Sequence, residues 1–259
     1  MTKLYKKSEI AFAIVWIVLY IAGTIVADEV SVRIGAPKSI TAGYHLLLTA
    51  LLLTWIFLNK LHVKYGLCKA AFGMKSFLYF LPLLVLISTN FWLGVEFNLN
   101  LVESILFFVS MLCVGFIEEI IFRGFLFKAM EKSNLKAACI VSSLTFGIGH
   151  IINLIMGNGT LVSNICQIFY AIAVGFLFVI LFYKGKSLLP CIITHSLVNA
   201  FSLFLNQSAM TTLMEIITSV VIILVSVLYS IYLIKKIPNK YEPDFIAPPE
   251  NNKENKEKE

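Results

Sequence analysis

Eight apolar segments, each long enough to cross a lipid bilayer, dominate the sequence. A membrane-spanning helix needs about 20 mainly apolar residues. Runs of that length lie at residues 9–27, 42–59, 77–94, 101–127, 137–156, 162–183, 187–205 and 212–234. With 59% hydrophobic and only 14% charged residues, the composition excludes a disordered chain and argues against a water-soluble protein. We therefore predict an all-α fold, a polytopic membrane bundle of eight transmembrane helices.

The basic residues indicate how these spans are oriented. Lys and Arg collect in cytoplasmic loops, and 18 of the 21 lie in alternate connecting segments, at 1–8, 60–76, 128–136, 184–186 and from 235 onward. The remaining connections hold only Arg33 and Lys38, and Arg123 lies inside an apolar run. Both termini are therefore predicted to be cytoplasmic. Because the cations are spread over short loops and form no stripe, we expect the lipid bilayer, and no nucleic acid, as a partner.

The chain divides into one long apolar part and a short polar one. Residues 1–236 are expected to form the transmembrane domain, and 237–259, rich in Pro, Lys, Glu and Asn, a disordered cytoplasmic tail. Residues 28–41, with Gly35 and Pro37, are expected to form an outer loop. The five cysteines have no CxxC spacing and are odd in number, so no disulfide framework or zinc knuckle is predicted.

One cluster of polar residues lies deep within the apolar segments. An ionisable side chain near the centre of a membrane helix costs at least about 2.5–3.5 kcal/mol, so a cluster of them indicates function. Its members are Glu118, Glu119 and Arg123 in the fourth span, His150 in the fifth, and His195 and Asn199 in the seventh. At about 1.5 Å per residue, the three helices can bring these groups to a common depth. We expect them to converge on one pocket.

Helix geometry predicts which of these residues face one another. Glu119 and Arg123 are four apart and can form an ion pair, and His195 and Asn199 share a face for the same reason. Glu118 is rotated by about 100° from Glu119 and is left without such a partner. A lone intramembrane His or Asn can simply join two helices, and an ion pair can lock a bundle. A carboxylate without a partner beside a second carboxylate is harder to explain in that way.

These side chains are suited to activating a water molecule. A carboxylate and a histidine can share the water as general base, while His and Asn donors stabilise an oxyanion on the attacked carbonyl. Alternatively Glu118, His150 and His195 could bind a divalent metal such as zinc, with a position open for water. A third possibility is a non-catalytic membrane immunity factor, or an ion- or proton-coupled transporter, that uses the same Glu/His cluster.

The spacing of the cluster resembles a known family. Glu118-Glu119-Ile120-Ile121-Phe122-Arg123, Phe146-Gly147-Ile148-Gly149-His150 and His195-Ser196-Leu197-Val198-Asn199 match the E-E-x-x-x-R, F-x-x-x-H and H-x-x-x-N motifs. These are the motifs of the CAAX protease and bacteriocin-processing (CPBP, or Abi) intramembrane proteases, which are related to the type II CAAX prenyl endopeptidase. The motifs occur in order, on separate predicted spans, within a core of about residues 77–205.

The resemblance implies a role for each residue. Glu118 and His150 would activate the water, His195 and Asn199 would form the oxyanion hole, and Glu119 with Arg123 would order the site. It implies that the protein is an intramembrane endopeptidase that crosses the cell membrane several times. We expect this membrane to be a bacterial plasma membrane. The expected substrates are peptide pheromones, bacteriocins or other membrane-associated peptides, or the role is self-immunity to bacteriocins. We favour chemistry without a cofactor, with the zinc site as the alternative.

Overall fold

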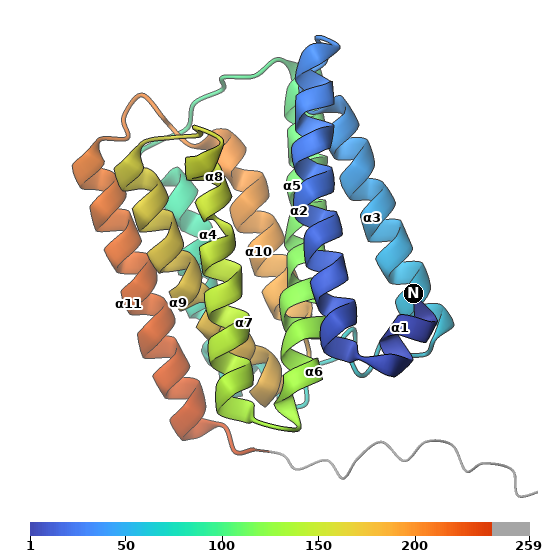
Figure 1. Cartoon of the computed structure of the whole chain (residues 1–259). Coiled ribbons are helices and arrows are strands. Elements are labelled where there is room, and N and C mark those ends of the chain that lie inside the picture. Colours follow the sequence, from blue (N-terminus) through green and yellow to red (C-terminus); the bar gives the residue numbers. More distant parts are fainter. Residues whose placement is uncertain (240–259) are drawn as a thin grey trace, which may run out of the picture.

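The chain folds as a bundle of helices joined by short connections (Figure 1). The structure is a computed structural model that describes residues 1–239, and it contains no β-strand within that range. The prediction of an all-α membrane fold is confirmed. The bilayer explains this choice, because a helix satisfies its own backbone hydrogen bonds where water is absent.

Seven long helices form most of the bundle. They are α2 (Glu9–Arg33), α3 (Ser39–Leu58), α5 (Leu101–Glu119), α7 (Leu135–Gly149), α9 (Leu161–Gly185), α10 (Leu189–Phe201) and α11 (Thr212–Lys236). The shorter pieces are α1 (Thr2–Lys7), η1 (Met74–Phe80), α4 (Leu81–Ser88), η2 (Thr89–Phe91), η3 (Ile120–Phe127), α6 (Lys128–Glu131), α8 (Ile151–Ile155) and η4 (Ser202–Phe204). Polar side chains cap the beginnings of α2, α5, α7, α9 and α11. At α5, Asn100 and Glu103 form a reciprocal capping box that satisfies two backbone N–H groups.

Seven of the eight predicted spans are long and apolar enough to cross a membrane, counting consecutive helical pieces together. The seventh, predicted at 187–205, is the exception, since its apolar helix covers only Leu189–Phe204. At about 1.5 Å per residue this helix is shorter than the roughly 30 Å of hydrocarbon. The count of eight spans therefore stays a prediction, and so does the cytoplasmic location of both termini.

The third span is interrupted near its beginning. Leu78, Tyr79 and Phe80, the last three residues of η1, have left-handed backbone angles, with φ of 50°, 53° and 58°, and break the helix before α4 begins. The break leaves backbone carbonyls without helical partners. The Tyr229 hydroxyl of α11 donates to the carbonyl oxygen of Phe77 at 2.8 Å and satisfies one of them.

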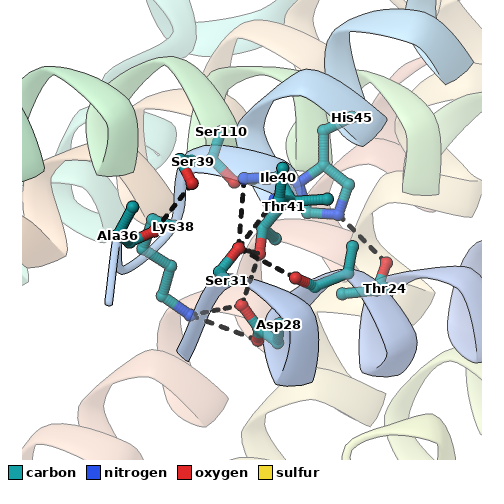
Figure 2. A network of polar contacts seen from close by, with 11 residues as sticks. Thr24, Asp28, Ser31, Ala36, Lys38, Ser39, Ile40, Thr41, His45 and Ser110 are labelled. Carbon is teal, nitrogen blue, oxygen red and sulfur yellow. Dashed lines mark hydrogen bonds and ion pairs between the residues drawn. The ribbon is translucent and has the colours of Figure 1, made fainter. Parts of the chain in front are cut away.

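The expected outer loop at 28–41 is mostly helical. α2 continues to Arg33 and α3 begins at Ser39, which leaves only residues 34–38 as a connection. Gly35, with a φ of 68°, makes the turn. The prediction of a 14-residue loop was wrong because the polar side chains near its ends bond to one another across the two helices, as Figure 2 shows.

Helix α5 lies between two groups of helices (Figure 1). The α2–α3 hairpin packs on one side of it, α10 packs against another face, and α7, α9 and α11 pack in succession beyond. The crossing of α5 and α10 is close because Gly115 faces the backbone of Ser196, where a Cβ would come within 2.4 Å of the Ser196 nitrogen. Small residues permit such close approach between membrane helices.

The lysine-rich segments lie at one end of the bundle, where α1, α6 and the end of α11 are found (Figure 1). At this end Lys184 of α9 donates to the carbonyl oxygen of Ile237 at 2.7 Å, beyond the last turn of α11. Ile237 itself is buried, so the packed part of the chain extends slightly past residue 236. Residues 240–259 of the tail predicted at 237–259 lie outside the described residues.

Candidate active site

Three packed helical segments carry the polar cluster. Glu118 and Glu119 are the last two residues of α5, and Arg123 follows in η3. His150 caps the C-terminal end of α7, and His195 lies in the middle of α10. Both carboxylates, the guanidinium and the His195 imidazole are buried. The sequence therefore places four ionisable groups where each must find a partner.

Glu119 is the centre of a buried ion-pair network. Its Oε1 accepts from Arg123 Nη1 at 2.9 Å, which is the ion pair expected from the four-residue spacing. The same oxygen lies 2.8 Å from His195 Nδ1. Because Glu119 and Arg123 have no exposed side-chain surface, removing either partner would leave a buried charge. The network fixes the orientation of the His195 ring.

Aromatic rings enclose the guanidinium. The Arg123 Cζ lies 4.1 Å from the centre of the Phe146 ring and 5.6 Å from that of Phe178. Cation–π contacts of this kind stabilise a desolvated cation. Gly175 gives the group room, because a Cβ there would come within 3.2 Å of Arg123 Nη2. Phe146 also contacts the two histidines edge-on, with ring centres 5.4 Å from His150 and 5.5 Å from His195.

Glu118 has a different environment from its neighbour. Its Oε1 accepts a hydrogen bond from the Tyr20 hydroxyl at 2.7 Å. Its Oε2 lies 3.3 Å from His195 Nε2 but has no hydrogen-bond partner among the described residues. The expectation that Glu118 lacks a partner was therefore wrong for one oxygen. Tyr20, on the first span, was missed because a tyrosine in an apolar run is usually a packing residue.

The motif of the fourth span includes a π-helix. Residues Ile120–Phe127, predicted as continuous α-helix, wind instead as η3, and all eight are buried. Short π-helical segments inside α-helices occur frequently at functional sites. The wider turn changes the partners of the backbone carbonyls. The Ser142 hydroxyl of α7 donates to the Phe122 carbonyl at 2.8 Å and gives that oxygen a partner on another helix.

A cavity opens beside the two histidines. Its volume is about 90 Å³, and His150, His195 and Asn199 all line it. A water needs roughly 10–15 Å³ of such volume, so several can fit. The other walls are mainly apolar and include Leu86, Val174, Phe178, Val198 and Ile222. Glu118 is not part of the wall, but it reaches the cavity through its contact with His195 and interacts electrostatically with His150.

Asn153, three residues after His150, does not join the site. Its side-chain amide donates to Gln167 of α9 at 3.0 Å, which ties the ends of two helices together. The residues that the structure brings together are the six predicted ones, with Tyr20 and Phe146 added. Their contacts are described by the geometry above, whereas their roles in a reaction remain proposals.

The alternative of a zinc site finds no ready-made group of ligands in this arrangement. Within residues 1–239, no three His, Cys, Asp or Glu side chains are grouped so that they could hold a metal ion. Glu119 occupies Nδ1 of His195 at 2.8 Å, and Nε2 is the nitrogen that lies near Glu118, at 3.3 Å. We therefore derive no step through a metal.

A comparison with known families finds a match over the segment that carries the polar cluster. A family model described as type II CAAX prenyl endopeptidase Rce1-like matches residues 100–201. That segment begins at the cap of α5, ends with α10 and contains all six predicted site residues. The matched segment is similar to this CAAX protease family. Its members are intramembrane proteases, and helices α1–α4 and α11 lie outside the matched segment. No curated protein and no solved structure matches the chain.

Proposed function

We propose that the chain is an endopeptidase that hydrolyses a peptide bond with a water activated by Glu118, without a metal cofactor. The observation that carries this proposal is the Oε2 atom of Glu118, which is buried and has no hydrogen-bond donor in the described part of the protein. A carboxylate oxygen left in this state, next to a histidine that lines the cavity, is a ready acceptor for a water.

The remaining groups support one path for the reaction. Glu118 takes a proton as the water oxygen attacks the carbonyl carbon, and His150, facing the same cavity, helps to orient that water. His195 and Asn199 donate to the oxyanion that forms. The C–N bond then breaks, and the proton held by Glu118 passes to the leaving nitrogen. The products are a carboxylate and an amine, and Glu118 returns to its starting state.

The network around Glu119 supports the assigned role of His195. With Glu119 bonded to Nδ1, the Nε2 nitrogen is the one directed at Glu118 and the reacting groups.

The cavity favours an apolar peptide as substrate. Leu86, Val174, Val198 and Ile222 surround the space next to His195 and Asn199, so apolar side chains or groups near the scissile bond would be desolvated there. We propose membrane-associated peptides such as pheromones and bacteriocins, processed at a bacterial plasma membrane. A role in self-immunity would use the same hydrolysis.

The deciding experiment compares wild type with Glu118→Gln. Purified proteins in liposomes are given internally quenched fluorescent peptides, one farnesylated near its C-terminus and one unmodified, with and without a chelator. Gln keeps the shape and can still accept from Tyr20, but it cannot take a proton. We expect kcat to fall by about 10²- to 10⁴-fold, and the wild type to be insensitive to the chelator.

Glu215→Gln is the matched control, since Glu215 lies in the first turn of α11, outside the cluster. It should cleave like wild type. Equal cleavage by wild type and Glu118→Gln would refute the proposed mechanism, and loss of activity with the chelator would refute metal-free chemistry. A transporter or non-catalytic immunity factor would cleave neither peptide.

A further inference from the structure

Helix α2, which lies outside the segment matched by the family model, contributes a side chain to the catalytic cluster. The Tyr20 hydroxyl donates to Glu118 Oε1 at 2.7 Å, and Tyr20 is 8% exposed, so little water competes for this bond. A hydrogen bond to a charged group in a buried site is stronger than one between neutral groups. It joins residues 98 positions apart in the chain.

The bond restricts which carboxylate oxygen can act. Tyr20 occupies Oε1, and Oε2 is left facing His195 Nε2 without a hydrogen-bond partner among the described residues. We propose that Tyr20 is a positioning residue, which holds the Glu118 carboxylate so that Oε2 is directed at the water. This inference rests on the proposed role of Glu118.

A second polar network holds α2 in place next to α5. Figure 2 shows His45 of α3 between Thr24 and Ser110, with Nε2 at 3.0 Å from Thr24 Oγ1 and Nδ1 at 2.8 Å from Ser110 Oγ. Thr24 follows Tyr20 by one turn of α2, and Ser110 precedes Glu118 on α5. The buried imidazole thus joins the two helices that carry the Tyr20–Glu118 bond. The Tyr20 and His45 rings also lie close together, with centres 6.0 Å apart.

The outer end of the hairpin extends this network. Asp28 of α2 accepts from Lys38 Nζ at 2.9 Å and from the Thr41 hydroxyl at 2.6 Å (Figure 2). Ser31 Oγ accepts from the backbone nitrogens of Ile40 and Thr41, at 3.1 and 3.3 Å. These bonds fix how far α2 can slide or rotate against α3. We infer that the hairpin acts as a clamp that sets the position of Tyr20.

A purely structural role for Tyr20 makes a different prediction. Interhelical hydrogen bonds in membrane proteins contribute about 0.6 kcal/mol on average, and losing one would lower stability without altering kcat in the folded protein. Tyr229 provides the comparison outside the hairpin. Its hydroxyl also forms one interhelical hydrogen bond, donated to the carbonyl oxygen of Phe77 at 2.8 Å.

The test measures kcat, KM and the thermal unfolding midpoint for Tyr20→Phe and Tyr229→Phe, using the unmodified quenched peptide in liposomes. Displacing a reacting group by about 1 Å can cost roughly 100-fold in rate. We expect Tyr20→Phe to lower kcat by about 10- to 100-fold with KM changed less than about threefold. Tyr229→Phe should keep the wild-type kcat.

Further variants distinguish a failure of the positioning role of Tyr20 from a failure of the proposed function. Tyr20→Phe added to Glu118→Gln should have no additional effect on kcat, because the two changes remove the same function. If Glu118→Gln is inactive while Tyr20→Phe retains kcat within twofold, the positioning role is refuted and the proposed function stands. If Glu118→Gln is active, the proposed role of Glu118 is refuted, and the positioning role of Tyr20 is refuted with it.

Thr24→Val tests the clamp with the Tyr20 hydroxyl intact, and it applies even if Tyr20→Phe does not fold. It should lower kcat at unchanged KM, and Thr24→Ser, which keeps the hydroxyl bonded to His45, should restore the rate. A wild-type kcat for Thr24→Val would overturn the inference that the hairpin sets the position of Tyr20.

Discussion

Gly115→Ala tests the closeness of α5 and α10 at the active site. Gly115 precedes Glu119 by one turn and faces Ser196, the neighbour of His195. An added Cβ would lie 2.4 Å from the Ser196 backbone nitrogen, so the helices must separate by about 1 Å to reach the 3.4 Å of an ordinary contact. Overpacking of this kind costs about 1–3 kcal/mol.

The same displacement would stretch the contacts that hold His195. Its Nδ1 lies 2.8 Å from Glu119 and its Nε2 3.3 Å from Glu118, and neither contact survives as a hydrogen bond or close pair after a shift of that size. We expect kcat to fall by about 100-fold. The loss of kcat should be larger than the fraction of protein that is unfolded at the assay temperature can explain.

Peptide cleavage and thermal unfolding of the same liposome samples would check this prediction. Gly43→Ala is the matched control, because a Cβ at this helical position in α3 meets nothing within 4 Å. It should keep activity and unfold at the same or a higher temperature. Should Gly115→Ala retain kcat within threefold of wild type, the argument that this crossing sets the site geometry would be wrong.

Three further predictions concern the cluster and the tail. Arg123→Met should destabilise the protein by about 3–5 kcal/mol, because Glu119 is left buried without its cation; denaturant unfolding would measure this, and the added change Glu119→Gln should recover part of the loss. Asn199→Ala should lower kcat by about 10²- to 10³-fold, as for loss of one oxyanion donor, whereas Asn153→Ala should keep kcat in the same cleavage assay. A chain ending at residue 239 should cleave peptides at the full-length rate, and a loss of more than half the rate would contradict the view that the tail carries no catalytic group.

The spans and the main contacts of the site could be predicted from the sequence for simple physical reasons. A run of about 20 apolar residues has few alternatives to a membrane helix, and the four-residue spacing of Glu119 and Arg123 places them on one face. Buried charges must be paired, so polar residues on separate spans were expected to meet. The contacts of both carboxylates with His195 bear out that expectation.

Other features have no comparable signal in the sequence. The π-helix has the same apolar composition as the α-helix before it, and no residue type marks the change. The helix at Leu189–Phe204 is mainly apolar and lies in a longer apolar run, so hydropathy alone did not show how short it is. Tyr20 lies in a segment that could face lipid or protein. Only the packing of α2 on α3 and η3 shows which groups the hydroxyl reaches.

The π-helix gives the fourth span a property that a uniform helix would lack. Each of its turns holds about one more residue than an α-helical turn. Side chains that follow the eight residues of η3 therefore point in other directions around the helix axis than they would in a continuous α-helix. The carboxylates of α5 and the basic residues beginning at Lys128 can therefore face different directions on one continuous rod. Rewinding residues 120–127 as ordinary α-helix would turn the lysine-bearing end of the span relative to the carboxylates.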